Sequence, residues 1–352
     1  MNRTARTLLA AMLSIALVAA LAGCSKPAAS TGTNAPVAPA KVRIGTLPTE
    51  DSLPLWVAER DGLFTKAGLD VTIQVFQSAQ ERDAALTAGA IDGFMGDLIA
   101  AATLRAGGVP ARVATIMLGA TPAEGRFGIA VKPGSKVTKP SELANIPVGV
   151  SSATIQEYVF DSIMTGSGVR TALIKKEEVK KVPVRFELLM SGKLEAAALP
   201  EPFLSLAEKT GARIIADDTT ATASAIPTAC VDCTKTVAGE WALGANISET
   251  VMLFSQKYLD DPAGSAAVSK LLGVWDEAVA VVNADPGSFR ALLVDKARLP
   301  APLATSYKVN TYPTAQLPKE ADVNAVLSWM GRMGYLKTSV TYDDLMWTAP
   351  AK

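Results

Sequence analysis

Histidine is absent from the whole 352-residue chain, and cysteine occurs only three times. Without histidine the protein cannot build a Ser-His-Asp triad or a Cys-His pair, and most zinc sites are excluded as well. The chain also lacks an excess of either charge, because 34 basic and 34 acidic residues give a formal net charge of zero. A nucleic-acid partner would need a basic face. We therefore expect no nucleic acid, no metal ion and no other cofactor.

The N-terminal segment has the features of an export signal. Arg3 and Arg6 precede an apolar run that ends in "LAGC", and at about a dozen residues this run is too short to span a membrane as a mature helix. "LAGC" resembles the bacterial lipobox, whose cysteine becomes the diacylated N-terminus. We expect residues 1–23 to be a lipoprotein signal peptide and Cys24 to be lipidated, since two acyl chains give stable anchoring. An ordinary signal peptide with a chance cysteine is the alternative.

The next residues, 24–40, are rich in Pro, Ala, Ser and Thr and have no periodic apolar face. Such a composition is typical of a flexible tether. The remaining cysteines, Cys230 and Cys233, stand in "ACVDC". In an oxidising compartment we expect a short-loop disulfide between them. A redox-active pair would need a cationic neighbour, for which only Lys235 is at hand, and a metal site without histidine is weaker still.

Strand and helix patterns alternate through the first part of the folded chain. Alternating or β-branched segments predict strands at 41–47, 69–76, 90–95 and 111–117. The helices expected between them span 48–62, 78–89 and 97–108; the first has Asp51 or Ser52 as its cap, the second has a capping-box pattern at Ser78 and Glu81, and each ends at a glycine. Strands that alternate with helices indicate a largely parallel α/β sheet.

A similar pattern recurs later in the chain. "GKLEA" (192–196) corresponds loosely to "GAIDG" (89–93), and each follows a helix pattern and precedes a short strand. A second lobe would begin near residue 135, with a strand at 147–151 and a helix opening near Ser152. The segments 262–286 and 322–336 carry apolar residues three and four apart, so we expect helices that pack back on the first lobe.

Several segments together carry a family pattern: "LPLWVAERDGLFTKAGLDVTI" (53–73), "AALTAGAIDGFMGD" (84–97), "PSELANIPVGVSS" (140–152), "LPEPF" (199–203) and "LSWMGRMGYLKTSVTYDDL" (327–345). In order and spacing they resemble the extracytoplasmic solute-binding proteins of ABC importers, in the group that serves sulfonates, taurine, nitrate and thiamine-pyrimidine precursors. The region 217–249 departs from the pattern and resembles an insertion.

The resemblance implies a two-lobed α/β fold, the type II periplasmic-binding-protein fold, in which each lobe is a mostly parallel sheet flanked by helices. Lobe I would comprise residues 41–131 and 245–352, and lobe II residues 132–244. The lobes would hinge near the strands at 127–131 and 250–255. In such sheets ligands bind beyond the carboxyl ends of the strands, so the loops at the strand ends are the candidate site.

Two of these loops lie in lobe I. The first, "LPTED" (47–51), offers Thr49 and Glu50. Thr49 and Asp51 also suit a turn and a helix cap, whereas the cap can be completed without Glu50. The second, "MGDL" (95–98), offers Gly96, which permits close backbone approach, and Asp97, which begins a helix. A cap at a strand end also faces the cleft, so the two roles of Asp97 are compatible.

The loop "SSAT" (151–154) in lobe II is the strongest candidate. Ser151, Ser152 and Thr154 supply hydroxyls at a helix start, where free N–H groups and the helix dipole can hold an anion. The resemblance also implies ligand contacts at this loop. The alternative is that both serines only cap the helix. Tyr158, one turn later, would hydrogen-bond a ligand or be buried.

The remaining candidates are spread over both lobes. Glu201 in "PEPF" is a poor helix cap and is therefore free to point across the cleft, opposite Asp97. Phe203 and Trp56 would form apolar walls, although residues of these types are more often part of the core. Arg126 would pair with an anionic ligand or with a surface acid. Acids combined with one anion-binding helix start fit an aminopyrimidine or a zwitterion better than a simple oxyanion.

The predicted function is therefore capture of a small polar organic solute and its delivery to an ABC permease and its ATPase. We expect a monomer outside the cytoplasm, held by its lipid to the bacterial membrane, at the cell surface or in the periplasm. A ligand sensor without transport is the alternative. Enzymes of pyrimidine or menaquinone biosynthesis share the fold, but export and the lack of histidine argue against catalysis. The ligand stays open among sulfonates, aminopyrimidines, amino acids and other solutes.

Overall fold

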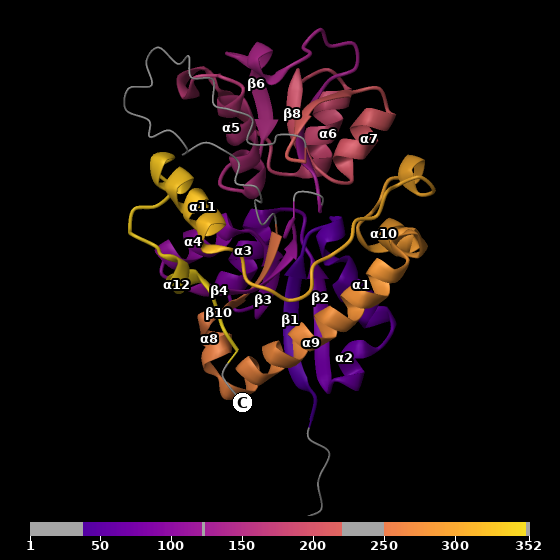
Figure 1. The fold of residues 1–352 in the computed structure, drawn as a ribbon, viewed down its shortest axis with the longest axis vertical. Helices are drawn as coiled ribbons and strands as arrows, with labels where there is room; N and C mark the ends of the chain where they lie inside the picture. The colour runs from indigo at the N-terminus through magenta and orange to yellow at the C-terminus, as the bar shows by residue number, and fades with distance from the viewer. Residues whose placement is uncertain (1–37, 122–123, 220–249, 350–352) are drawn as a thin grey trace, which may run out of the picture. The chain divides into compact units, whose positions relative to one another are not determined.

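Figure 1 shows the computed structural model, which describes residues 38–121, 124–219 and 250–349. The described residues from Pro39 onward belong to one compact unit. The predicted signal peptide, Cys24, nearly all of the tether, Cys230 and Cys233, and the lobe boundary at 244 lie outside the described residues. Those expectations therefore stay predictions.

Lobe I is built on a five-stranded sheet of order β2-β1-β3-β10-β4. Its strands are β1 (Ala40–Thr46), β2 (Leu69–Val75), β3 (Gly93–Gly96), β4 (Ala111–Leu118) and β10 (Thr250–Ser255). β1 pairs in parallel with β2 and β3, whereas β10 runs antiparallel to its neighbours β3 and β4. The four strands predicted from the first part of the chain are therefore all present, in one mostly parallel sheet.

Lobe II repeats this plan in a sheet of order β7-β6-β8-β5-β9. Its strands are β5 (Phe127–Val131), β6 (Pro147–Val150), β7 (Lys175–Glu178), β8 (Ala196–Pro200) and β9 (Arg213–Asp217). β6 pairs in parallel with β7 and β8, and β5 runs antiparallel to β8 and β9. Because β5 occupies the position that β10 holds in lobe I, the two sheets have the same topology, as the loose sequence correspondence suggested.

The position of β5 corrects one predicted boundary. We expected lobe I to extend to residue 131, but β5 pairs within the lobe II sheet, so the chain enters lobe II at Phe127. All five residues of this strand are buried. A strand that is apolar on both faces fits the centre of either sheet, so its sequence cannot show which sheet it joins.

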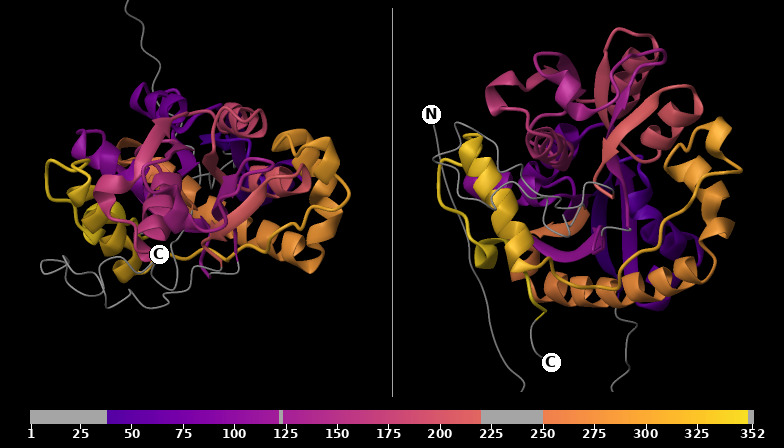
Figure 2. Two further views of the ribbon diagram at one scale, coloured as in Figure 1. Left: turned by 90° about the horizontal axis from the view of Figure 1, so that it is seen from above. Right: turned by 45° about the horizontal axis from the view of Figure 1, so that its top comes forward.

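Helices cover both sheets, as Figures 1 and 2 show. Those that follow strands of lobe I are α1 (Leu53–Arg60), α2 (Leu63–Lys66), α3 (Ala79–Thr87) and α4 (Leu98–Ala106). Lobe II contains α5 (Ile155–Gly166), α6 (Val182–Met190) and α7 (Phe203–Lys209). The C-terminal part forms α8 (Gln256–Asp260), α9 (Pro262–Ala284), α10 (Arg290–Lys296), α11 (Glu320–Arg332) and α12 (Tyr342–Leu345). None of the described helices is both long and apolar enough to cross a membrane.

Helix starts follow the expected caps in some places and not in others. Ser78 accepts a hydrogen bond from the Glu81 N–H at the start of α3, and Asp97 accepts one from Ala100 N at the start of α4. Neither Asp51 nor Ser52 caps α1, which is preceded by a short 3-10 helix at Glu50–Ser52. α5 begins at Ile155, three residues later than predicted, because residues 151–154 form a turn.

The C-terminal helices return to lobe I, as predicted. The long helix α9 packs against α1 and strands β1, β2 and β4, and α11 packs against α4. α11 also contacts lobe II, since its Trp329 Nε1 donates to Asp161 Oδ2 of α5 at 3.1 Å. This arrangement leaves the carboxyl ends of the parallel strands of both sheets facing one another.

Candidate functional site

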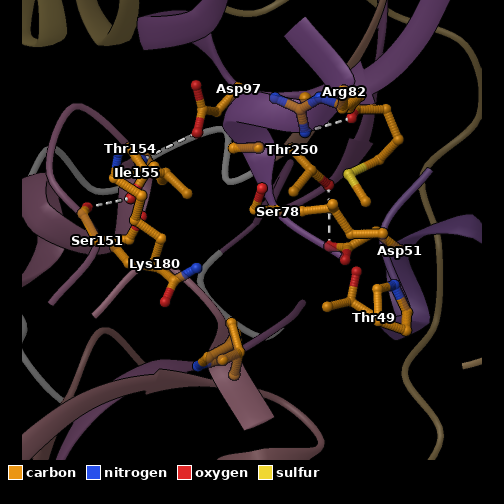
Figure 3. Close-up of a pocket in the computed structure, with 18 of the residues that line it drawn as sticks. Thr49, Asp51, Ser78, Arg82, Asp97, Ser151, Thr154, Ile155, Lys180 and Thr250 are labelled. Atoms are coloured by element: carbon orange, nitrogen blue, oxygen red, sulfur yellow. Dashed lines mark hydrogen bonds between the residues drawn. The ribbon is translucent and has the colours of Figure 1, made fainter. Parts of the chain in front are cut away.

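A pocket of about 690 Å³, including its open mouth, lies between the strand ends of the two sheets. Lobe I supplies the loop after β1, the end of β3 and the start of α3, and lobe II supplies the loop after β6 and the start of α6. Figure 3 shows Asp97, Arg82, Thr250 and Asp51 on one side of the cavity, and Ser151, Thr154 and Ile155 across from them. The pocket therefore has the location predicted from the fold.

Half of the predicted site residues line this pocket. They are Thr49, Gly96, Asp97, Ser151, Thr154 and Phe203. They come from strand-end loops of both lobes, or from a helix start in the case of Phe203. The other half lie elsewhere, and each has a physical reason for its position.

Glu50 and Trp56 are buried in lobe I, outside the pocket lining. Glu50 is 2% exposed, its Oε1 accepts from Asn310 Nδ2 at 2.6 Å, and its carbonyl accepts from the Tyr312 hydroxyl. Burial raises the pKa of Glu50 well above its ordinary value, and the nearby charges of Glu201 and Asp51 raise it further. Trp56 is a core residue at 1% exposure. The prediction that Glu50 faces the cleft fails because its side chain turns toward the C-terminal segment.

Arg126 and Glu201 belong to an ion-pair group in lobe II. Arg126 Nε donates to Asp217 Oδ2 at 2.8 Å, and its Nη1 reaches Glu201 Oε1 at 3.4 Å. Both carboxylate oxygens of Glu201 also accept hydrogen bonds from Ser205, one from its N–H and one from its hydroxyl. Glu201 therefore turns toward the first turn of its own helix and does not point across the cleft.

Ser152 and Tyr158 face away from the cavity. Ser152 donates to the Glu178 carboxylate through both its N–H, at 3.0 Å, and its hydroxyl. Tyr158 is buried against Trp329, with ring centroids 5.5 Å apart in an edge-to-face arrangement. The structure therefore places them in the supporting framework of the "SSAT" loop.

Sequence reasoning did not select seven polar residues of the lining: Asp51, Gln77, Ser78, Arg82, Gln156, Lys180 and Thr250. Asp51 belongs to the candidate loop "LPTED", with a helix cap as its alternative role, and Ser78 is predicted only as a helix cap. Arg82 lies in a helix whose pattern gave no reason to expect a buried arginine, and Thr250 begins a strand that is distant in the sequence. The position of Asp51 in the loop after the strand predicted at 41–47 is the signal that could have identified it.

Asp97 connects the two lobes. Its Oδ1 accepts from Ala100 N at 2.7 Å, which caps α4, and its Oδ2 accepts from Ile155 N, at the start of α5 in lobe II, at 3.0 Å. Burial raises the pKa of Asp97, although the charge of Arg82 and the two backbone hydrogen bonds oppose this shift. The anion-binding helix start predicted at "SSAT" is thus occupied by a carboxylate of the chain itself.

Arg82 is 2% exposed, and each of its guanidinium nitrogens donates a hydrogen bond within the chain. Nη1 donates to Met95 O at 2.7 Å, and Nη2 and Nε donate to Asp83 Oδ1 at 2.8 and 3.1 Å. The guanidinium carbon also lies 4.3 Å from the centroid of the Phe94 ring, which is a cation–π contact. Arg82 therefore supports the strand end at Met95. It lines the cavity with a charge that is paired with Asp83.

Asp51 is the second carboxylate of the cavity. Its Oδ1 accepts from the Thr250 hydroxyl at 3.1 Å, and burial raises its pKa. Apolar walls, among them Phe127, Phe203 and Ile155, complete the lining. Within residues 38–121, 124–219 and 250–349 there is no group of three or more potential metal-ligating side chains. The lining is thus suited to hydrogen bonding and apolar contact with a small molecule.

The sequence profile of the NMT1-like family matches residues 35–273, which is more than half of the chain. The chain belongs to the NMT1-like family. No curated protein sequence matches this NMT1-like chain.

Solved structures share the fold of this NMT1-like protein at low sequence identity. The alkanesulfonate-binding protein SsuA from Xanthomonas axonopodis pv. citri, bound to MOPS, aligns with a TM-score of 0.68 and 17% identity over 88% of this chain and 99% of its own. The periplasmic aliphatic sulphonate binding protein SsuA from Escherichia coli gives 0.66 and 19% over 88% and 93%. The periplasmic nitrate-binding protein NrtA from Synechocystis PCC 6803 gives 0.63 and 14% over 87% and 84%. These similarities confirm the predicted fold and the resemblance.

Proposed function

We propose that this NMT1-like protein is the solute-binding component of an ABC importer and captures a small polar organic solute between its lobes. The observation that carries the proposal is the cavity at the strand ends, which takes hydrogen-bonding groups from both sheets. Ligand contacts that form only when both lobes meet would favour the closed form. The fold shared with sulfonate- and nitrate-binding proteins supports the same role.

The proposal includes the surroundings of the protein. A lipid on Cys24 would hold it outside the cytoplasm beside a permease and its ATPase, as a monomer, and Cys230 and Cys233 would form a disulfide. The periplasmic location of the related folds supports export. A sensor that binds a solute without transport has the same cavity, and a neighbouring permease gene would distinguish the two. The fold relatives named above are binding proteins, which supports binding over catalysis.

The direct test is a ligand screen on the chain from residue 24 onward, with Cys24→Ser to prevent acylation. Sulfonates, aminopyrimidines, amino acids and aromatic acids would be compared by thermal unfolding. A solute at a hundred times its Kd stabilises the native state by about 2.7 kcal/mol, which is readily measured. We expect saturable stabilisation by one class without turnover. Product formation, or no stabilisation by any solute, would contradict the proposal.

A matched pair of variants tests the cavity as the binding site. Asp97→Asn should weaken the solute found in the screen at least tenfold, equivalent to about 1.4 kcal/mol, because Asp97 lines the cavity. Glu201→Gln changes an acid at the corresponding strand end of lobe II, but Glu201 turns toward Ser205. Isothermal titration should therefore show that the Glu201→Gln variant binds the solute with an affinity within about twofold of that of the original chain. Equal effects of the two variants would remove Asp97 from the site.

A further inference from the structure

Three N–H donors at the start of α5 and in the loop before it are occupied by carboxylates of the chain. Ser152 N donates to Glu178 Oε2 at 3.0 Å, Ala153 N donates to Glu157 Oε2 at 2.7 Å, and Ile155 N donates to Asp97 Oδ2 at 3.0 Å. A helix start of this kind binds an anion because its N–H groups lack partners within the helix. Here three acids from three different elements already provide the negative charge.

Asp97 differs from the other two acids in its origin. Glu157 and Glu178 belong to lobe II, as does the loop, whereas Asp97 is fixed in lobe I by its own hydrogen bond from Ala100 N. Asp97 also lines the cavity, and its carboxylate is directed at Ile155 in Figure 3. A carboxylate from one lobe therefore takes the position that an anionic solute would need in the other lobe.

The other charges of the cavity also disfavour an anion. Asp51 adds a second buried carboxylate, at 7% exposure, beside Thr250. Arg82 is the buried base of the lining, and its guanidinium is already bound to Met95 O, the Asp83 carboxylate and the Phe94 ring. Lys180, the second base of the lining, is exposed. An oxyanion entering this cavity would meet two carboxylates, and the buried cation of the lining, Arg82, is already paired with Asp83.

We infer that the cavity selects a solute whose recognised end presents N–H donors, most favourably on a cation, to Asp51 and Asp97, and that Asp97 is the residue that excludes oxyanions such as sulfonates. This inference rests on the proposed function and adds the chemical class of the solute. Burial raises the pKa of both carboxyls, and a bound cation would compensate for the water that the carboxylates have lost.

Two probes with the same apolar body and opposite charge test the inference. Benzamidinium presents N–H donors on a cation, and benzenesulfonate presents an oxyanion. Each would be titrated against the chain from residue 24 onward with Cys24→Ser, and against that chain carrying Asp97→Ser. Serine is also a preferred helix cap, so α4 keeps its cap, but the shorter side chain vacates Ile155 N. Asp261→Ser is the control, because Asp261 caps α9 through Ala263 N and is not part of the cavity lining.

We expect benzamidinium, and not benzenesulfonate, to stabilise the starting chain and the control in a saturable way. Asp97→Ser should lower benzamidinium affinity at least tenfold and raise benzenesulfonate affinity at least tenfold. Circular dichroism would show that the variant is folded. Stabilisation of the starting chain by benzenesulfonate overturns the inference and leaves solute binding intact. Binding of neither probe also overturns it, and the proposed function then fails only if the whole solute screen is negative.

Discussion

Each lobe contains one buried arginine, in the helix before β3 in lobe I and in the helix before β8 in lobe II, and the two arginines occupy equivalent positions. Arg82 of α3 donates to the carbonyl of Met95 in β3, and Arg185 of α6 donates to that of Ala198 in β8. Each side chain also lies beside a glycine, Gly45 of β1 in lobe I and Gly149 of β6 in lobe II. The repeated topology thus extends to individual side chains.

The acids that follow β3 and β8 differ in their hydrogen-bond partners. Asp97 crosses to the helix start of the other lobe, whereas Glu201 remains with Ser205 and Arg126 of its own lobe. As a result the cleft has a carboxylate side in lobe I and a helix-start side in lobe II. The repeated framework thus fixes the positions of the strand ends. The nearest available hydrogen-bond donors decide where the side chains of Asp97 and Glu201 point.

Replacing the buried arginines should have the largest effect. Arg185→Ala removes the donors to Ala198 O and Val179 O, at 2.8 and 2.6 Å, and leaves a cavity. We expect the free energy of unfolding to fall by about 3–5 kcal/mol. Arg82→Ala should cost about 2–4 kcal/mol by the same reasoning. Urea unfolding with an unchanged m-value would measure both.

The exposed Arg60 provides the control for this pair. Its guanidinium donates hydrogen bonds to the neighbouring Asp61 at the surface. Arg60→Ala should change the unfolding free energy by less than about 1 kcal/mol. Burial lowers the pKa of Arg185 to about 10, so this arginine carries its charge at pH 7. If only one of the two substitutions destabilised the protein, the equivalence of the two positions would be refuted.

The glycines beside the arginines should give the next largest effect. A Cβ on Gly45 would lie 2.7 Å from Ile91 Cδ1 and 3.3 Å from Arg82 Cγ, and one on Gly149 would lie 2.6 Å from Leu194 Cδ1 and 3.2 Å from Arg185 Cγ. Gly45→Ala and Gly149→Ala should each destabilise the protein by about 1–2 kcal/mol, since the core must move to admit a methyl group.

Gly273, in α9, is the matched control for the glycine substitutions. A Cβ there meets nothing within 4 Å, so Gly273→Ala should stabilise the protein by about 0.5–1 kcal/mol through helix propensity. Differential scanning calorimetry would rank the three variants. Tolerance of alanine at Gly149 but not at Gly45 would show that lobe II is packed more loosely around its arginine.

The loops after β1 and β6 differ in charge, because only the loop after β1 contains acids. Glu50 makes this difference testable. Its pKa is raised in the folded state by burial, then by Glu201 and Asp51. An acid with a raised folded pKa favours folding while it is protonated, and stability is lost as the pH rises above the ordinary value of 4.5. Glu50→Gln should therefore stabilise the protein at pH 8, on the order of 1 kcal/mol, and lose this advantage at pH 4.

Thermal unfolding of the Glu50 variant between pH 4 and 8 is the measurement. Glu59→Gln is the control, because the Glu59 side chain is 40% exposed and such surface changes stay within about 0.5 kcal/mol. A Glu50 variant that is less stable than the starting chain at pH 8 would indicate that the ionised carboxylate is needed by Asn310.

Replacing the surface ion pairs next to the starts of β8 and β3 should have the smallest effect on stability. Lys132 Nζ lies 2.7 Å from Glu195 Oε2, with side chains 32% and 26% exposed, and Arg43 pairs with Asp92 at the corresponding place in lobe I. Lys132→Ala and Arg43→Ala should each cost about 0.2–1 kcal/mol at pH 7 and low salt, and less in high salt.

The pH dependence of the Lys132 variant has a definite sign. Burial alone would raise the pKa of Glu195, but hydrogen bonds from Lys132 and Ser135 outweigh it and lower the pKa. The stabilisation is therefore present above the ordinary pKa of 4.5 and is lost as the pH falls below it. Chemical unfolding at pH 7 and pH 3 should show a difference between Lys132→Ala and the original chain only at pH 7.

Local patterns explain what could be predicted from the sequence. The strand expected at 41–47 is found at Ala40–Thr46, and the helix expected at 78–89 is found at Ala79–Thr87 with Ser78 as its cap. Alternation, caps and terminal glycines are properties of neighbouring residues, so they can be read from one segment at a time. Burial of Arg82 and Arg185 was not predictable, because the carbonyls that accept from them lie thirteen residues away on a different element.

By itself, the sequence determined the order of strands and helices, the neutral charge and the lack of histidine, because these follow from composition and short-range periodicity. Only the tertiary structure decided that β5 joins the lobe II sheet and that Asp97 reaches Ile155 while Glu201 turns back to Ser205. The physical reason is that a strand buried on both faces fits either sheet, and a carboxylate binds whichever donors the folded chain brings within about 3 Å.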